Sequence, residues 1–497
     1  MKKCYFLLSA VFALSITACN GGNPGKDSNN ANFTPYKDPT MDVAFEKIDD
    51  TCMVPSYVKD YIDAMHDQEA SIHYPNRVDS LYCNMTWAEA ASQSDKDDGV
   101  TYDEDHSGGV DVCQMLRQGS AMPYKNIPIE IKWDKGDEDF SGAELAFWSN
   151  ADMSDLRTVP VESSGASAKL PNLMRNTKYY YQLIVGDQAS QMKNFVTDDY
   201  SRIISMGSVG NIRDMGGYRS SFGGRINQGL IFRGGEINPA AFTADGSSHS
   251  KNFDASEGSA DQKVQQEVLQ IGLELDLRTK SGSANKVDSG LAYDGDWIWE
   301  NTYPNADKNS NDDGKAQYVR SAINAYDSFI TDQNRKGEGD NAGRDLVGEI
   351  FNYFAKADQQ HVYFHCWGGA DRTGVTGFLL LGILGATYTD AIIDFELTTL
   401  CNNKRCHMHN SRNAHFPKFL KYFTSEYTFT RADENGEQQE HKYEFDADAT
   451  LNVNATNLLL AMGVKLETIE QIRTIMIPGY KAGVTQEEEF ENKGWQR

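Results

Sequence analysis

One stretch of the sequence has the residue types and spacing of a nucleophilic phosphate site. Residues 365–374 read His-Cys-Trp-Gly-Gly-Ala-Asp-Arg-Thr-Gly, so that a thiol at Cys366 precedes a guanidinium at Arg372 by five loop residues. A thiolate attacks a phosphate ester when its pKa is lowered, and a helix N-terminus with a nearby guanidinium lowers it. The pattern therefore predicts that Cys366 is a nucleophile and that Arg372 grips two phosphate oxygens with its planar fork.

The residues between the thiol and the guanidinium fit an anion-binding loop. Gly368 and Gly369 allow the positive φ angles with which successive backbone N–H groups turn inward as a nest. We expect Trp367, Gly368, Gly369 and Ala370 to line the bound phosphate. A bare Cys-x5-Arg pattern also occurs by chance, so this interpretation depends on the flanking sequence.

The flanking sequence predicts the elements that hold such a loop. Residues 361–365 are typical of a short buried strand, and residues 374–386 form an apolar run typical of a buried helix. A strand, a tight loop and a helix in this order place a phosphate at the positive end of the helix dipole. A structural cysteine between a strand and a helix is the alternative interpretation.

The N-terminus is expected to be a targeting segment. Two lysines precede an apolar run that is shorter than the roughly 20 residues needed to span a bilayer. Residues 16–19 (Ile-Thr-Ala-Cys) resemble the lipobox of bacterial lipoprotein signal peptides, which implies cleavage after residue 18 and lipidation of Cys19. An ordinary cleaved signal or a lone transmembrane segment is the alternative.

This resemblance implies an exported bacterial lipoprotein, anchored to a membrane in the periplasm or at the cell surface. Residues 1–18 would be the signal peptide, and residues 19–35, rich in Asn, Gly and Ser, would be a flexible tether. The expected partners are the membrane, through the N-terminal lipid, and a phosphorylated substrate, either a phosphopeptide or a small phosphate ester.

The composition indicates a folded, acidic protein. The chain has 497 residues, of which 39% are hydrophobic and 11% aromatic, enough for roughly three domains with packed cores. A net charge of −25, without a basic stripe, argues against a nucleic-acid-binding protein.

Several cysteines remain after Cys19 and Cys366 are assigned, and an oxidising compartment favours one or two disulfides. The sequence offers Cys401–Cys406 and a pair among Cys52, Cys83 and Cys113, without choosing among them. A cluster of cysteines and histidines could instead bind zinc, but its spacing is not that of a regular structural site (Cys401, Cys406, His407, His409, His415). We expect no metal and no cofactor.

The acidic residues 95–105 likewise lack calcium-loop spacing and are expected to form a solvated loop.

Hydrophobic patterns divide the body of the chain into three parts. Residues 36–120 show little pattern beyond a short helix expected at 58–66. Residues 121–200 are expected to be a β-sandwich, because short alternating strands recur there (127–133, 144–148, 179–185, 192–196). Residues 170–181 resemble the Leu-x-Pro and Thr-x-Tyr corner of fibronectin type III domains, which usually support or present another domain.

Residues 201–497 alternate strand-like and helix-like segments, which is typical of an α/β layered domain. A strand is expected at 273–277, and helices are expected at several positions (264–269, 318–329, 344–357, 389–399, 466–476).

Three further motifs precede the thiol loop in order. They read Asn-Ile-Arg-Asp at 211–214, Ile-Phe-Arg-Gly at 231–234 and Asp-Leu-Arg-Thr at 276–279. Together with the loop they resemble the bacterial tyrosine-phosphatase-like family, whose members carry Asn-Phe-Arg-Asp, Leu-Phe-Arg-Ser, Asp-Leu-Arg-Ser and His-Cys-x-x-Gly-Lys-Asp-Arg-Thr-Gly. The resemblance implies an α/β cysteine-phosphatase domain with a central sheet flanked by helices. It also implies metal-free hydrolysis of phosphotyrosine, other phosphoprotein or phosphoinositide esters through a phosphocysteine intermediate.

The resemblance also implies roles for the loop residues. Cys366 matches the nucleophile and Arg372 the phosphate clamp, while Asp371 matches the family's loop aspartate, which orients the arginine or moves a proton. Thr373 would hydrogen-bond the thiolate and help it leave. His365 would set the loop geometry and tune the thiol pKa.

Two other assignments keep an alternative open. Asp276 and Arg278 match the family's Asp-Leu-Arg and are candidates for substrate binding, with a structural ion pair as the alternative. A general acid must protonate the leaving oxygen, and the family places it on a loop near a proline. Asp307, three residues after Pro304, is the candidate, and Asp371 is its rival.

Departures from the family pattern bear on the substrate. Ala370 replaces the family lysine, which removes one positive contact expected for phosphoinositide headgroups. Trp367 would add an aromatic wall beside the thiolate, or else be a core residue. Apolar walls suit an aryl phosphate, and we expect a phosphatase acting on phosphotyrosine or phosphoprotein. The alternatives are an inositol polyphosphate or phosphoinositide phosphatase on the same scaffold and a catalytically weak surface binding protein.

Overall fold

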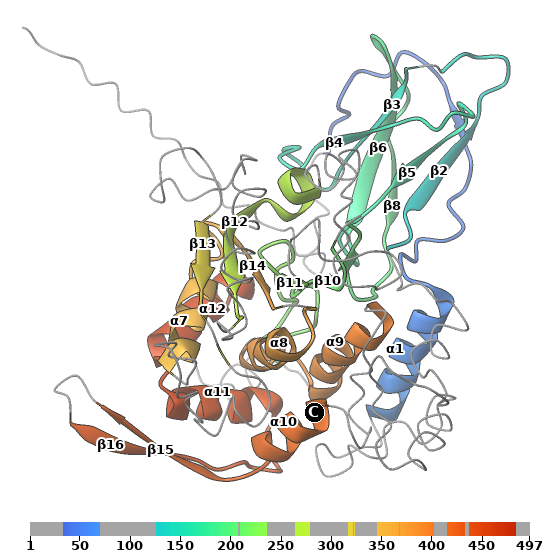
Figure 1. The fold of residues 1–497 in the computed structure, drawn as a ribbon. Helices are drawn as coiled ribbons and strands as arrows, with labels where there is room; N and C mark the ends of the chain where they lie inside the picture. Colours follow the sequence, from blue (N-terminus) through green and yellow to red (C-terminus); the bar gives the residue numbers. More distant parts are fainter. Residues whose placement is uncertain are drawn as a thin grey trace, which may run out of the picture.

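Two groups of strands form the framework of the chain (Figure 1). The fold comes from a computed structural model, which describes part of the chain (residues 33–69, 126–140, 142–206, 209–235, 264–278, 317–321, 323, 345–366, 368–401, 415–432 and 437–483).

The first group consists of two antiparallel sheets that share one hydrophobic core. One sheet has the order β1 (Ala44–Phe45), β2 (Ile129–Asp134), β5 (Ser167–Leu170). The other has the order β4 (Arg157–Pro160), β3 (Glu144–Trp148), β6 (Lys178–Val185), β7 (Gln188–Ala189), with β8 (Lys193–Val196) also paired to β6. Alternate side chains of β2, β3 and β6 fill the core between them, because successive residues of a strand point to opposite faces. The strands expected at 127–133, 144–148, 179–185 and 192–196 are all present.

The second group is a six-stranded mixed sheet. Its order is β13 (Gln317–Arg320), β12 (Ile271–Asp276), β14 (His361–His365), β11 (Ile231–Gly234), β10 (Ile212–Asp214), β9 (Ile203–Ile204). The first four strands are parallel to one another, β10 is antiparallel to β11, and β9 is antiparallel to β10. Parallel strands end at the same edge of a sheet, and here His365 lies in register with both Asp276 and Gly234. Three of the motifs found in the sequence therefore meet at one edge.

Helices cover one face of this sheet, as expected for the phosphatase-like part of the chain. They are α7 (Asp345–Phe354), α8 (Asp371–Ile383), α9 (Tyr388–Cys401), α10 (His415–Phe423), α11 (Leu451–Met462) and α12 (Leu466–Met476). Val362 and Phe364 of β14 join the core under these helices, whereas Tyr363 points to the other face, toward the π-helical turn Gln265–Leu269. A hairpin of β15 (Tyr427–Ala432) and β16 (Gln438–Tyr443) follows α10.

The segment from residue 33 to residue 69 contributes to both cores. Its strand β1 pairs with β2 in the N-terminal sheets. Helix α1 (Ser56–Glu69) instead lies against α9 and buries Val58 and Met65 in the core of the mixed sheet. The helix expected at 58–66 is thus present and longer than expected.

A buried ion pair connects the two groups of strands. Arg202 donates to Asp214 at 2.6 Å and, through Nε and Nη2, to the carbonyl oxygens of Leu173 and Asn172. Asp214 also accepts the N–H groups of Gly216 and Gly229. The aspartate of the 211–214 motif therefore shapes the adjoining turns and anchors the N-terminal sheets, rather than facing the thiol loop.

The prediction of a helix at 318–329 is wrong for its first residues, because Gln317–Arg320 form strand β13. This strand pairs in parallel with β12, a partner distant in sequence. Pairing with a buried strand outweighs a weak local helical pattern. The other expected helices, at 264–269, 344–357, 389–399 and 466–476, are present, the first of them as the π-helical turn. Among the described residues, no helix is both long and apolar enough to cross a membrane.

The position of α1 predicts that it stabilises the mixed-sheet core. Met65 is fully buried there, so Met65→Ala should lower the free energy of unfolding by about 2–5 kcal/mol through lost apolar contacts and the cavity left behind. Denaturant unfolding followed by fluorescence measures this change. Leu466→Ala, at a position 53% exposed on α12, is the control and should have little effect. Equal stability of the two variants would show that α1 does not belong to this core.

Candidate active site

The thiol loop connects the C-terminal end of β14 to the first turn of α8. Cys366 follows the last residue of the strand, and the helix begins at Asp371. Gly369 has φ +66°, and a Cβ on it would lie 2.4 Å from the backbone of Gly234. The loop thus packs directly on the end of β11, and only glycine fits at this position.

The thiol of Cys366 is buried, with 4% of the residue exposed. Burial raises its pKa, but the Arg372 guanidinium, Thr373 and His365 together lower the pKa to about 7. The contribution of Thr373 comes from both its side chain and its backbone N–H at the start of α8. A substantial fraction of the thiol is therefore ionised at neutral pH, as a nucleophile requires.

His365 is held on both sides by hydrogen bonds. Its Nε2 lies 2.9 Å from Oε1 of Glu274 on β12, and its Nδ1 lies 2.9 Å from the carbonyl oxygen of Cys366. A carbonyl oxygen only accepts, so Nδ1 carries a proton and donates a hydrogen bond to it, and the N–H at Nε2 donates a hydrogen bond to Oε1 of Glu274. Burial lowers the pKa of His365, but the hydrogen bond with Glu274 and the charge of Asp276 raise it to about 9. His365 is thus an imidazolium next to the Cys366 thiol.

A buried carboxylate on α9 brings two motif arginines to the loop. Asp394 binds Nε of Arg213 at 3.0 Å and also binds Arg233. Burial raises the pKa of Asp394, but the two arginines lower it below its ordinary value. Arg233 donates through Nη2 to the carbonyl oxygen of Gly369 at 2.8 Å. The 211–214 and 231–234 motifs thereby contact the thiol loop.

Asn211 supplies a second contact to the same loop. Its Nδ2 donates to the carbonyl oxygen of Gly368 at 2.9 Å and lies 3.3 Å from the hydroxyl of Thr398. Asn211 has φ +63°, a left-handed conformation that asparagine tolerates better than most residues. The local sequence gave no sign of this role, nor of the roles of Glu274 and Asp394, because none of these residues lies near the loop in sequence.

Asp276 and Arg278 form a buried ion pair with each other. Nε and Nη2 of Arg278 each lie 2.8 Å from a carboxylate oxygen of Asp276, and both side chains are almost fully buried. This is the geometry of a structural ion pair, which was the alternative to substrate binding. Direct contact of either residue with a substrate stays a prediction.

The remaining described loop residues lie at the N-terminal end of α8, with Ala370 at its N-cap. Arg372 is the second residue of α8, and its Nη1 is buried without a hydrogen-bond partner among the described residues. Asp371 is half-buried in the first turn of the helix, while Ala370 and Thr373 are buried. Three predicted residues, Trp367, Asp307 and Cys19, lie outside the described residues.

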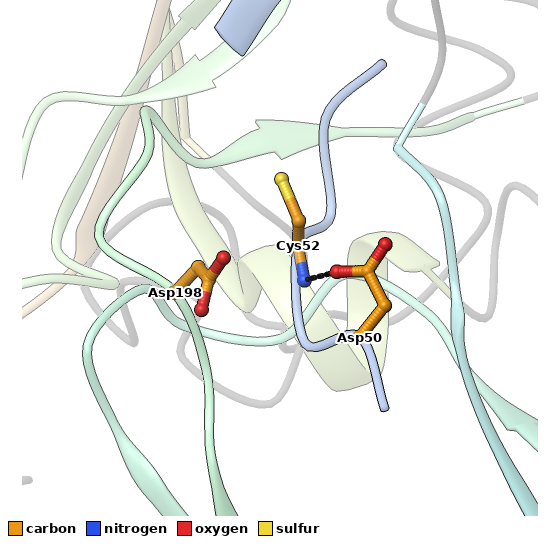
Figure 2. A group of neighbouring side chains, drawn as sticks. All are labelled: Asp50, Cys52 and Asp198. Atoms are coloured by element: carbon orange, nitrogen blue, oxygen red, sulfur yellow. Dashed lines mark hydrogen bonds between the residues drawn. The ribbon is translucent and has the colours of Figure 1, made fainter. Parts of the chain in front are cut away.

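A separate group of possible metal ligands, Asp50, Cys52 and Asp198, lies near the start of α1 (Figure 2). Asp50 accepts the N–H of Cys52, and Asp198 accepts the hydroxyl of Thr51. Burial raises the pKa of the free Cys52 thiol above its ordinary value. These contacts explain the group as a structural cluster. Most of the Cys/His group at 401–415, weighed as an alternative zinc site, lies outside the described residues, as do Cys83 and Cys113.

The part of the chain that holds the central sheet and the thiol loop matches the sequence pattern of a known class of enzymes, the phosphatases. The sequence model of the tyrosine phosphatase family matches residues 204–464, which span β9 to α11 and the thiol loop. This match covers more than half of the chain, and the chain therefore belongs to the tyrosine phosphatase family. No curated protein matches the chain.

The contacts of His365 predict that Glu274→Gln raises the pKa of the Cys366 thiol. Without the carboxylate, His365 loses the main group that keeps it charged, and the thiolate loses a neighbouring positive charge. Iodoacetamide labelling of the Cys366 peptide, followed by mass spectrometry across pH 5–9, should show the labelling midpoint moving upward from about 7.

The matched control is Glu396→Gln, which also changes a fully buried glutamate, here one that accepts a hydrogen bond from Tyr61 of α1. Its labelling midpoint should equal that of the unmodified protein. If Glu274→Gln also leaves the midpoint in place, Glu274 does not control the thiol.

Proposed function

We propose that the protein is a cysteine-dependent phosphatase that hydrolyses phosphate monoesters through a phosphocysteine intermediate. The observation that carries this proposal is the Cys366 thiol, whose pKa is lowered to about 7 beside the Arg372 guanidinium at the N-terminus of α8. Membership of the tyrosine phosphatase family supports phosphatase activity in general.

The proposed reaction has two steps. In the first, the Cys366 thiolate attacks phosphorus in line, the bond from phosphorus to the ester oxygen breaks, and an acid donates a proton to the leaving oxygen. Inward-facing loop amides and Arg372 stabilise the equatorial oxygens. In the second step, a water molecule attacks phosphorus, its proton passes to the same carboxylate, and the thiolate leaves with help from Thr373. Asp371, half-buried beside Arg372, or Asp307 would supply the carboxylate.

The proposed substrate class is an aryl phosphate such as phosphotyrosine in a peptide. Ala370, at the N-cap of α8, carries no charge, whereas the bacterial tyrosine-phosphatase-like family that the loop resembles has a lysine at this position. A polyphosphorylated inositol would need such additional cations around its outer phosphates. The choice of an aryl ester is therefore favoured by the weak positive charge of the loop.

We further propose that residues 121–200 form a fibronectin type III-like sandwich that supports the catalytic domain, residues 201–497. The two N-terminal sheets share one core, and the Tyr179 hydroxyl accepts the N–H of Met174. A tyrosine whose hydroxyl bonds the backbone a few residues upstream is typical of such sandwiches. A lipid on Cys19 would anchor these domains to a bacterial membrane, in the periplasm or at the cell surface.

The thiolate mechanism predicts that Cys366→Ser abolishes turnover of para-nitrophenyl phosphate in the presence of EDTA. The serine hydroxyl is a far weaker nucleophile, and the rate should fall on the order of a thousandfold or more. Turnover is measured by release of nitrophenolate between pH 4 and 8, with circular dichroism to show that the variant is folded.

Turnover that survives in folded Cys366→Ser would refute the thiolate mechanism. No turnover in either protein would favour the binding-protein alternative. Among active preparations, hydrolysis of a phosphotyrosine peptide in preference to inositol hexakisphosphate is expected, and the reverse preference would support the inositol polyphosphate alternative.

The lipid anchor predicts that Cys19→Ala moves the full-length protein out of the membrane fraction. A single acyl-bearing residue would be removed while the described domains remain unchanged. Fractionation of bacteria that express the two proteins, with immunoblotting of the pellet and supernatant, measures the distribution. Equal membrane association of both proteins would contradict lipidation at Cys19.

A further inference from the structure

We propose that Asn211 and Arg233 are positioning residues that turn two backbone N–H groups of the thiol loop toward the phosphate. They do so by binding the carbonyl oxygens of Gly368 and Gly369 from outside the loop. This inference rests on the proposed phosphatase function, and it assigns a role to two motifs that contain neither the nucleophile nor the clamp.

The peptide units of the thiol loop are planar, so each carbonyl fixes the direction of the next N–H. In a trans peptide the carbonyl oxygen and the following N–H point in opposite directions. When Asn211 holds the Gly368 oxygen, the N–H of Gly369 must point away from Asn211, and when Arg233 holds the Gly369 oxygen, the N–H of Ala370 must point away from Arg233. Two successive amides are thereby fixed in the direction that an anion-binding nest requires.

The side chain of Asn211 is itself fixed by a residue that can only donate. Arg213 donates through Nη1 to Oδ1 of Asn211. Since a guanidinium has no acceptor, the amide oxygen must face Arg213, and Nδ2 must face the Gly368 carbonyl. An inverted amide would place two acceptors against each other at the loop.

Asp394 joins these contacts into one unit. It binds both Arg213, which orients Asn211, and Arg233, which reaches Gly369. All three charged side chains are essentially fully buried, so each guanidinium has a single favoured position set by the carboxylate. The alignment of the loop therefore exists before an anion binds, which avoids the cost of reorganising the loop during the reaction.

Removal of the side-chain N–H donor of Asn211 should weaken the binding of an oxyanion to the thiol loop. Asn211→Gly keeps the positive φ angle and removes the donor, and Asn211→Asp keeps the shape and places an acceptor against the Gly368 carbonyl. Calorimetric titration of tungstate into each variant, made in the Cys366→Ser protein, reports the oxyanion site without turnover. Loss of one aligned amide should weaken the affinity about tenfold or more, with the aspartate variant weaker than the glycine variant.

The controls are Asn176→Gly and Asn176→Asp, since Asn176 also has a positive φ angle but lies in the turn before β6. These variants should keep the tungstate affinity of the Cys366→Ser protein. Thermal unfolding of every variant separates a loss of affinity from a loss of folding.

The outcomes separate this inference from the proposed function. If the Cys366→Ser protein binds tungstate and folded Asn211 variants bind it equally well, the positioning role is refuted while the phosphatase proposal stands. If tungstate does not bind even with Asn211 present, the phosphate site itself is contradicted, and the positioning role with it.

Discussion

The buried carboxylate of Asp394 is the interaction on which the site depends. A charge removed from water is tolerated only when it is paired and hydrogen-bonded, and Asp394 meets this condition with two arginines from neighbouring strands. Arg213 comes from β10 and Arg233 from β11, so the carboxylate on α9 joins both strands to the helix layer. Arg233 donates to the carbonyl oxygen of Gly369, and Arg213 orients Asn211, which donates to that of Gly368. The geometry of the loop therefore depends on the ion pairs of Asp394.

The charges behind the thiol follow the same principle. Glu274, His365, Cys366 and Arg372 alternate in sign, with the imidazolium between a carboxylate and the thiolate. In surroundings from which water is excluded, each charge stabilises its neighbour more strongly than it would in solution. The lowered thiol pKa thus comes from the Arg372 guanidinium and Thr373 at the start of α8 together with His365, which Glu274 of β12 holds through a hydrogen bond.

The sequence predicted the elements that depend on local pattern and missed those that depend on distant partners. Strand β14 and the apolar helix α8 were predicted because their hydrophobic runs are strong and their ends are marked by the loop. Residues 318–320 were expected to begin a helix, but they belong to strand β13, which forms only by pairing with β12. The first turn of α1 and the role of Asp214 could not be predicted from the sequence either, because both depend on contacts with residues distant in the chain.

By itself, the sequence determined that a thiol and a guanidinium stand at the two ends of one short loop, because both lie within a few consecutive residues and the glycines between them allow a tight turn. The tertiary structure alone decided which groups tune and align the loop. Glu274 is 91 residues from His365, and Asn211 is 157 residues from Gly368, so their contacts arise only when the strands pair and α9 packs against them. A sequence displays residue types and near neighbours, whereas the pKa of a buried group and the direction of an amide depend on charges and donors brought together by folding.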